Sequence, residues 1–363
     1  MVVLLSLPLA FAGLRGCLPP IGRPTAPPPV VEGRGAATCD ACHAEQAAAW
    51  SRSTHARAES PVPPELAEAW SNQGIAPAPV RAIGVAPVVQ FLVPFDGGRL
   101  QVTDRAWDPR TGEWFSVFAD ARSPGEWGHW TGGGMTWNLQ CATCHSTGVV
   151  VGYDAVADRY ATTALEHRVG CPACHGDVQN HAAGGPPPRV VTSGLDGCAP
   201  CHARRAELTG RWTPGEPFLD HFAPQLVDRS DAFWADGQVR EEDFEYTAFV
   251  GSKMFAAGVV CTSCHDPHSG ELVAEGDPLC LGCHAAQAGF VAHDRHAAGV
   301  GCVGCHLPVT TYMQRDPRHD HGFRVPDPAL NQRFGIPDAC TRCHPDQGPE
   351  WTAARAAEWY PNL

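Results

Sequence analysis

The sequence has no apolar run long enough to cross a membrane as a helix. Its apolar start, residues 1–13, is shorter than the about 20 residues that a transmembrane helix needs. Positive charge is also scarce, since 39 aspartates and glutamates outnumber 26 lysines and arginines and the formal net charge is −13. This balance excludes nucleic acid as a partner, because phosphate backbones bind basic surfaces. Lysine itself is nearly absent, with Lys253 as the only one.

No thiols are left over for a disulfide framework, because sixteen of the 17 cysteines fall in one repeated pattern. The pattern is Cys-x-x-Cys-His, and it occurs eight times. In chain order the copies are motif 1 (Cys39, Cys42, His43), motif 2 (Cys141, Cys144, His145), motif 3 (Cys171, Cys174, His175), motif 4 (Cys198, Cys201, His202), motif 5 (Cys261, Cys264, His265), motif 6 (Cys280, Cys283, His284), motif 7 (Cys302, Cys305, His306) and motif 8 (Cys340, Cys343, His344).

This spacing is typical of c-type haem attachment. The two thiols form thioethers with the haem vinyl groups, and the histidine becomes the proximal iron ligand. A zinc ribbon or a disulfide pair would explain Cys-x-x-Cys alone. The fifth position excludes both, because histidine is 18 of 363 residues and a chance histidine after all eight pairs has a probability on the order of 10⁻¹⁰. The sequence therefore predicts eight c-type haems with their irons.

The remaining cysteine, Cys17, ends a Leu-Arg-Gly-Cys segment that is similar to a lipoprotein cleavage box except for its bulky arginine. We interpret residues 1–17 as a signal peptide, of either the lipoprotein or the plain type, and residues 18–35 as a Pro-rich tether. Haem attachment of this kind follows export. The predicted location is the periplasm, or attachment to the outer membrane or cell surface, and a lipid on Cys17 would make the membrane a partner.

The expected fold is that of a multihaem cytochrome c, with mostly short α-helices and loops around a haem core in residues 36–363. Eight haems leave about 45 residues each, too few for separate apolar cores, and 34 Pro with 38 Gly favour loops. Helices are expected to start within or just after motifs, as in residues 43–50 and again at 351–359. Strands are expected in one place only, a β-hairpin or meander subdomain at about residues 79–120, around the turn Asp96-Gly97-Gly98.

Ten histidines lie outside the motifs, enough to give most or all of the irons a second axial ligand. Two imidazoles make a haem six-coordinate and low-spin, the state suited to electron transfer. The candidates for these distal positions are His55, His129, His181, His268, His296 and His321. Weaker candidates are His221, His293, Lys253 and Met254. Methionine more often packs against the haem ring than binds its iron. Lysine, unlike arginine, has an amine that can lose its proton and bind iron, which makes the single lysine a candidate.

Several segments near the motifs share a wider pattern. They are His129-Trp130-Thr131-Gly132 and Trp137-Asn138-Leu139-Gln140 before motif 2, Ser252-Lys253-Met254-Phe255 before motif 5, and Asp320-His321-Gly322-Phe323 after motif 7. The pattern resembles octahaem c-type cytochromes of the kind often fused to tetratricopeptide repeats, in the superfamily of the ammonia-oxidiser tetrahaem cytochrome and pentahaem nitrite reductase. The resemblance implies that His321 caps a haem distally. Every motif here ends in histidine, whereas those nitrite reductases have a lysine in that place at their catalytic haem.

The sequence predicts electron transfer through the haems, with redox proteins of unknown identity as donor and acceptor. One alternative is a reductase or oxidase of a small nitrogen or sulfur compound at one iron with an open position, so the sequence does not decide whether the chain is an enzyme. A second alternative is a subunit of a haem filament, which requires complementary surfaces on successive copies.

Overall fold

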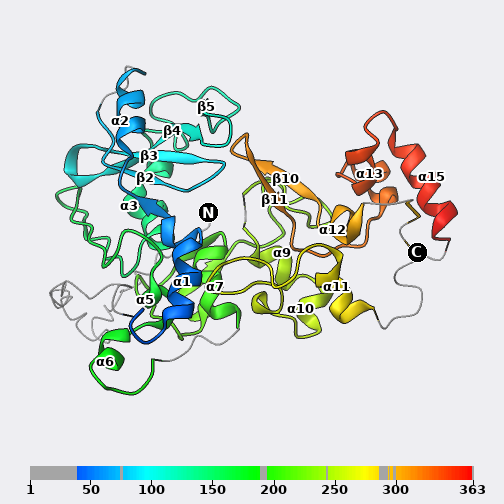
Figure 1. Cartoon of the computed structure of the whole chain (residues 1–363). Coiled ribbons are helices and arrows are strands. Elements are labelled where there is room, and N and C mark those ends of the chain that lie inside the picture. The colour runs from blue at the N-terminus through cyan, green and yellow to red at the C-terminus, as the bar shows by residue number, and fades with distance from the viewer. Residues whose placement is uncertain are drawn as a thin grey trace, which may run out of the picture. The chain divides into compact units, whose positions relative to one another are not determined.

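The computed structural model describes residues 39–73, 77–188, 194–242, 244–285, 293, 295–296 and 300–361. The expected signal peptide, the tether and Cys17 lie outside these residues. Contacts divide the chain into two units, Met1–Glu32 and Gly33–Leu363, and every described residue belongs to the second. This unit consists of short helices and small sheets joined by loops (Figure 1). Within the described ranges, no helix has the length and apolar character needed to span a bilayer.

The α-helices are short. They are α1 (Ala44–Arg52), α2 (Pro64–Ser71), α3 (Trp137–Gln140), α4 (Ala142–His145), α5 (Cys171–His175), α6 (Val178–Ala182), α7 (Leu195–His202), α8 (Phe218–His221), α9 (Tyr246–Val250), α10 (Lys253–Ala256), α11 (Asp277–His284), α12 (Gly301–His306), α13 (Pro328–Phe334), α14 (Ala339–Cys343) and α15 (Pro349–Trp359). Short 3₁₀ segments include η2 (His55–Arg57), η4 (Gly133–Met135) and η5 (Cys261–Ser263). Most motifs therefore lie on a helical turn.

The predicted helices at residues 43–50 and 351–359 are confirmed as α1 and α15. Other helices differ from the expectation that helices start within or just after a motif. Helices α7, α11 and α12 begin before their motifs and end at the motif histidine. An aspartate in the first turn, Asp196 or Asp277, favours the start of α7 and α11, and α11 also has proline near its beginning.

A five-stranded antiparallel sheet precedes motif 2 in the chain. Its strands pair in chain order: β1 (Glu59–Ser60), β2 (Arg81–Ile83), β3 (Val89–Pro94), β4 (Leu100–Asp108) and β5 (Glu113–Ser116). The turn between β3 and β4 is η3 (Asp96–Gly98), in which Gly97 and Gly98 have φ of 69° and 73°. Glycine adopts this left-handed conformation at little cost, so the hairpin expected at Asp96-Gly97-Gly98 is present. Strand β1 lies before the range in which strands were predicted.

The two faces of this sheet pack against different helices. Successive residues of a strand point to opposite faces, and in β3 Leu92 joins a buried cluster with Trp137 of α3 and Ala142 of α4. Phe91 instead joins a cluster with Trp70 of α2 on the other face. Since α4 contains the histidine of motif 2, the first cluster fixes this motif against the sheet.

The expectation that strands occur in one place only is wrong. Three further hairpins follow the sheet: β6 (Tyr153–Asp154) with β7 (Arg159–Tyr160), β8 (Arg205–Glu207) with β9 (Phe222–Pro224), and β10 (Val309–Tyr312) with β11 (Asp316–His319). Their strands have two to four residues, which is too short for an alternating apolar pattern to stand out. Strand β11 has no apolar side chain apart from Pro317.

Glu59 of β1 ties the sheet to the segment after motif 2. Its fully buried carboxylate accepts hydrogen bonds from Trp137 Nε1 at 3.2 Å and from Ser146 Oγ at 2.9 Å. It also pairs with Arg81 and with His167 Nδ1, the latter at 3.2 Å. Burial raises the pKa of Glu59, but the hydrogen bond from His167 and the charge of Arg81 outweigh this and lower it. The carboxylate is therefore charged and held on several sides.

We expect Glu59→Ala to destabilise the folded protein by about 3–5 kcal/mol, because it leaves the partly buried guanidinium of Arg81 without its counter-charge. Urea unfolding of the haem-loaded chain, followed by tryptophan fluorescence, measures this loss. The control is Asp158→Ala, which removes an ion pair with Arg99 in which the aspartate side chain is 59% exposed. Equal unfolding midpoints for the two variants would contradict the role of Glu59.

Candidate haem sites

The motif cysteines are placed as haem attachment requires. On a helical turn, side chains three positions apart lie on one face, and the two cysteines of each motif have this spacing. Motifs 3 and 4 lie wholly within α5 and α7, and motifs 6 and 7 within α11 and α12. Among the described residues no two cysteines form a disulfide. All sixteen motif sulfur atoms are thus available for thioethers.

Six motif histidines each face a histidine from another part of the chain. The distances between ring centroids are 6.3 Å for His43 and His181, 6.2 Å for His202 and His55, 6.4 Å for His175 and His268, 6.4 Å for His265 and His321, 5.9 Å for His306 and His293, and 6.5 Å for His344 and His296. We refer to these as the six histidine pairs.

The spacing of the six histidine pairs fits an iron between the two rings. Metal–imidazole bonds of about 2.0 Å on each side, added to the distance from nitrogen to ring centre, separate two opposed rings by roughly 6.4 Å. One such pair could be ordinary aromatic packing, which covers the same distances. Six pairs, each joining a motif histidine to a histidine outside the motifs, are instead the arrangement expected of axial ligands.

The hydrogen bonds of several paired rings fix which nitrogen faces the partner ring. Nδ1 of His306 lies 2.8 Å from the carbonyl oxygen of Arg324, and Nδ1 of His321 lies 2.9 Å from that of His319. Nδ1 of His265 likewise lies 3.3 Å from the carbonyl oxygen of Gly270. A carbonyl can only accept, so Nδ1 carries the hydrogen in each case and Nε2 keeps a lone pair. Such contacts orient imidazoles that bind metals.

In each pair the second histidine follows a different motif from the one it faces. His181 follows motif 3 and faces motif 1, whereas His55 follows motif 1 and faces motif 4. His268 follows motif 5 and faces motif 3, and His321 follows motif 7 and faces motif 5. His293 and His296, which both follow motif 6, face motifs 7 and 8. Apart from His293 and His306, the pairs therefore link segments that are far apart in the sequence.

Other predicted ligands lie elsewhere. His129 Nδ1 is 2.8 Å from Thr131 Oγ1, with its ring beside Trp130, and His221 contacts Thr209 and Glu216. Lys253 is exposed at the start of α10, and the adjacent Met254 is half-buried. The motif histidines outside the six pairs are His145 and His284. His145 Nδ1 lies 3.2 Å from the carbonyl oxygen of Ala58.

Cysteines of different motifs lie against one another. Four pairs of thiols lie close enough for one to shift the pKa of the other: Cys39 and Cys171, Cys144 and Cys201, Cys198 and Cys261, and Cys280 and Cys302. Cys174 lies near Cys198 and Cys201, Cys264 near Cys280, and Cys305 near Cys340. In a haem-loaded chain these sulfur atoms would be thioethers. Their closeness identifies which motifs are neighbours in the fold.

These neighbours place the motifs in one order. Motif 1 contacts motif 3, motif 3 lies near motif 4, and motifs 4 to 8 follow in sequence. Motif 2 joins this line at motif 4. Helix packing agrees, because α4 contacts α7, and α12 contacts both α11 and α14. Motif 4 is thus a junction with three neighbours, and spacing along the sequence gives no sign of it.

Two family models match parts of the chain. Residues 38–80 and 130–176 match "Cytochrome c554 and c-prime", which includes motifs 1 to 3 and His55. The residues between these matches contain strands β2 to β5. Residues 253–289 match "Doubled CXXCH motif" and include motifs 5 and 6. No curated protein matches the chain.

Two solved structures are similar to the chain. The outer cell wall cytochrome OcwA has a TM-score of 0.70 at 19% identity, covering 92% of this chain and 88% of OcwA. The undecahaem cytochrome from the S-layer of Carboxydothermus ferrireducens has a TM-score of 0.51 at 19% identity, covering 89% of this chain and 59% of that one. At this identity the likeness shows a shared fold.

Proposed function

We propose that this multihaem c-type cytochrome transfers electrons through eight covalently bound haems outside the cytoplasm. The observation that supports this most is the set of six histidine pairs. A haem held between two imidazoles has no vacant iron position, and it gains or loses an electron without binding a substrate. The chain's own contribution is to hold the ligand histidines in place and to keep neighbouring motifs in contact.

The order of the motifs supports a conduit with ends at motifs 1 and 8 and a branch at motif 2. The second cysteine of motifs 1 and 8, Cys42 or Cys343, is exposed, as are Cys174 and Cys283 within the line. An exposed attachment site lets a partner protein approach the haem edge. We therefore propose that redox partners dock near these two motifs, one as donor and the other as acceptor.

An exported location is part of this proposal. The two similar structures are those of an outer cell wall cytochrome and of a cytochrome from an S-layer. Covalent haem attachment at Cys-x-x-Cys-His follows export, which agrees with a position in the periplasm or at the cell surface. Lipidation of Cys17 and a membrane partner remain proposals from the sequence alone.

A second candidate function is reduction or oxidation of a small nitrogen or sulfur compound at motif 2. In the part of the chain that the structure describes, no histidine ring faces His145 at the spacing of the six pairs. An iron at motif 2 with an open position would be the place for such a reaction.

Protein-film voltammetry of the full haem-loaded chain separates these functions. If the chain only conducts, it gives reversible waves that nitrite, hydroxylamine and sulfite leave unchanged, because its irons have no position for them. A current that grows with one of these compounds would favour the enzyme. The His145→Met variant is the matched control, since a substrate current arising at motif 2 should change in that variant.

A further inference from the structure

The hydrogen bond at His202 differs from those of the other paired rings described above. Its Nδ1 lies 3.1 Å from a carboxylate oxygen, Glu245 Oε2. Nδ1 of His265, His306 and His321 instead contacts a backbone carbonyl. Glu245 directly precedes α9 and comes from a segment far from motif 4 in the sequence. A motif histidine thus donates to a full negative charge here.

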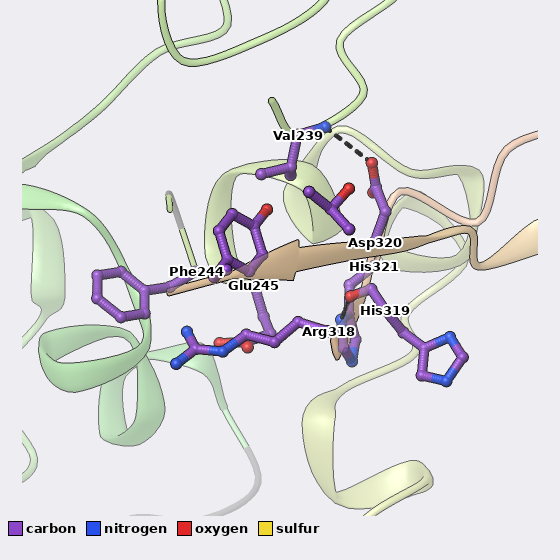
Figure 2. A pocket seen from close by; sticks show the side chains of 9 residues that line it. Val239, Phe244, Glu245, Arg318, His319, Asp320 and His321 are labelled. Carbon is purple, nitrogen blue, oxygen red and sulfur yellow. Dashed lines mark hydrogen bonds between the residues drawn. The ribbon is translucent and has the colours of Figure 1, made fainter. Parts of the chain in front are cut away.

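The charge of Glu245 is directed at two histidine pairs. Glu245, Arg318 and His321 surround the same small pocket (Figure 2). Arg318 binds other carboxylates, with Nη1 2.8 Å from Glu242 Oε1 and Nε 2.7 Å from Asp316 Oδ2. Glu245 Oε2 therefore presents its carboxylate charge to His202 directly, and Glu245 lies beside His321 at the same pocket.

A carboxylate that accepts the Nδ1 hydrogen makes an imidazole a stronger electron donor through Nε2. Hydrogen bonds of this kind raise the basicity of a metal ligand, and the potential of a haem depends on its axial ligands and their hydrogen bonds. A stronger donor stabilises the oxidised iron more than the reduced iron. The expected effect is a lower reduction potential at motif 4, with a weaker effect at motif 5, whose histidine faces His321.

We propose that Glu245 is a positioning residue that lowers the reduction potential of the haem at motif 4, the junction between motifs 2, 3 and 5. This inference rests on the proposed electron-transfer function. A low potential at the junction makes passage between the two sides of the chain the step that controls electron flow. Glu245 would then set the rate at which motifs 1 to 3 exchange electrons with motifs 5 to 8.

The angle between the rings of His55 and His202 gives a way to recognise the haem at motif 4 by spectroscopy. The rings of His55 and His202 cross at 78°, whereas the other five pairs cross at 16° to 48°. Nearly perpendicular imidazoles leave two iron d orbitals close in energy, and nearly parallel ones split them. The haem at motif 4 should therefore give a low-spin EPR signal distinct from the others, and its potential can be followed through that signal.

The test is a potentiometric titration of the full haem-loaded chain, monitored by EPR. In Glu245→Gln, which can no longer offer a charged acceptor, we expect the distinct signal to titrate with an equilibrium constant at least tenfold more favourable to reduction, about 59 mV for a one-electron couple. The matched control is Glu242→Gln, which removes the same charge nearby without a contact to His202. Its shift should be smaller.

A shift in Glu245→Gln no larger than that in Glu242→Gln would overturn the inference, because general loss of charge would then explain it. Should Glu245→Gln fail to fold, Glu245→Asp keeps the charge but shortens its reach, and it should raise the potential by part of the amount; an unchanged potential would overturn the inference. The outcome is independent of the proposed function, which fails instead if the unmodified chain gives a substrate-dependent current.

Discussion

Replacing any one of the six non-motif histidines of the pairs by glycine converts one haem from low spin to high spin. These histidines are His55, His181, His268, His293, His296 and His321. Each substitution removes one of two axial imidazoles, so the iron becomes five-coordinate. The visible and EPR spectra of each variant should lose one low-spin haem and gain one high-spin haem. Free imidazole fits the space left by the side chain and should restore the low-spin signal.

The control variants for this series are His129→Gly and His221→Gly. Both residues are candidate ligands by sequence, but in the structure they contact threonine hydroxyls. Their spectra should keep every low-spin haem of the unmodified protein. A loss of low-spin haem in His129→Gly equal to that in His268→Gly would show that the pairs do not identify the ligands.

Removing the haem at motif 4 is expected to divide the protein into two parts that no longer exchange electrons rapidly. Motif 4 joins motifs 2 and 3 to motif 5 through Cys201, Cys174 and Cys198. In Cys198→Ser/Cys201→Ser, electron transfer between motifs 1 to 3 and motifs 5 to 8 should slow more than tenfold. This corresponds to an activation barrier higher by more than about 1.4 kcal/mol. Electrons supplied near motif 5 should then rapidly reach motifs 5 to 8, four of the seven remaining.

Lys253 provides the place to supply these electrons. It is the only lysine, is exposed, and lies on α10 eight residues before motif 5. An amine-reactive photosensitiser can be attached there, with single-site labelling checked by peptide mapping. Flash photoreduction then measures the fraction of haem absorbance that changes in the fast phase. In the unmodified chain, haems on both sides of motif 4 should be reduced, with motifs 1 to 3 reduced at least tenfold faster than in the motif 4 variant.

The matched control for the motif 4 variant removes the haem at motif 2, with Cys141→Ser/Cys144→Ser. Motif 2 is a branch, so all seven remaining haems should stay in the fast phase. If the motif 4 variant also keeps its whole absorbance in the fast phase, the order of motifs derived from the cysteine contacts is wrong. A variant that loses more than one haem, as judged by mass, is replaced by Cys198→Ala/Cys201→Ala with the same expected contrast.

The motif cysteines and histidines could be predicted because haem attachment is local. Five consecutive residues contain the whole signal, and it recurs eight times. The partners of the motif histidines depend on which segment returns to which motif, and this is decided by tertiary packing. His293 was therefore only a weak candidate although it faces His306, and His129 was a stronger candidate although it lies beside Trp130.

The strands also differ in how much of their structure the local sequence predicts. Apolar runs on both sides of Asp96-Gly97-Gly98 predicted the hairpin of β3 and β4, because β3 is buried on both faces and is therefore a nearly continuous apolar run. Strand β11 consists of polar residues and a proline that are only partly buried or exposed, and it leaves no such pattern. Glu245 is similar, since a single glutamate before a five-residue helix gives no sign in the sequence that it contacts His202.

We propose above all that eight haems are attached and that at least six of them have two histidine ligands. Low-temperature magnetic circular dichroism of the oxidised full chain, combined with its intact mass, tests this directly. We predict a mass that contains eight haems and a near-infrared signature of bis-imidazole ligation at six or more of them. Fewer than eight haems in the mass, or fewer than six bis-imidazole haems in the spectrum, would contradict the account.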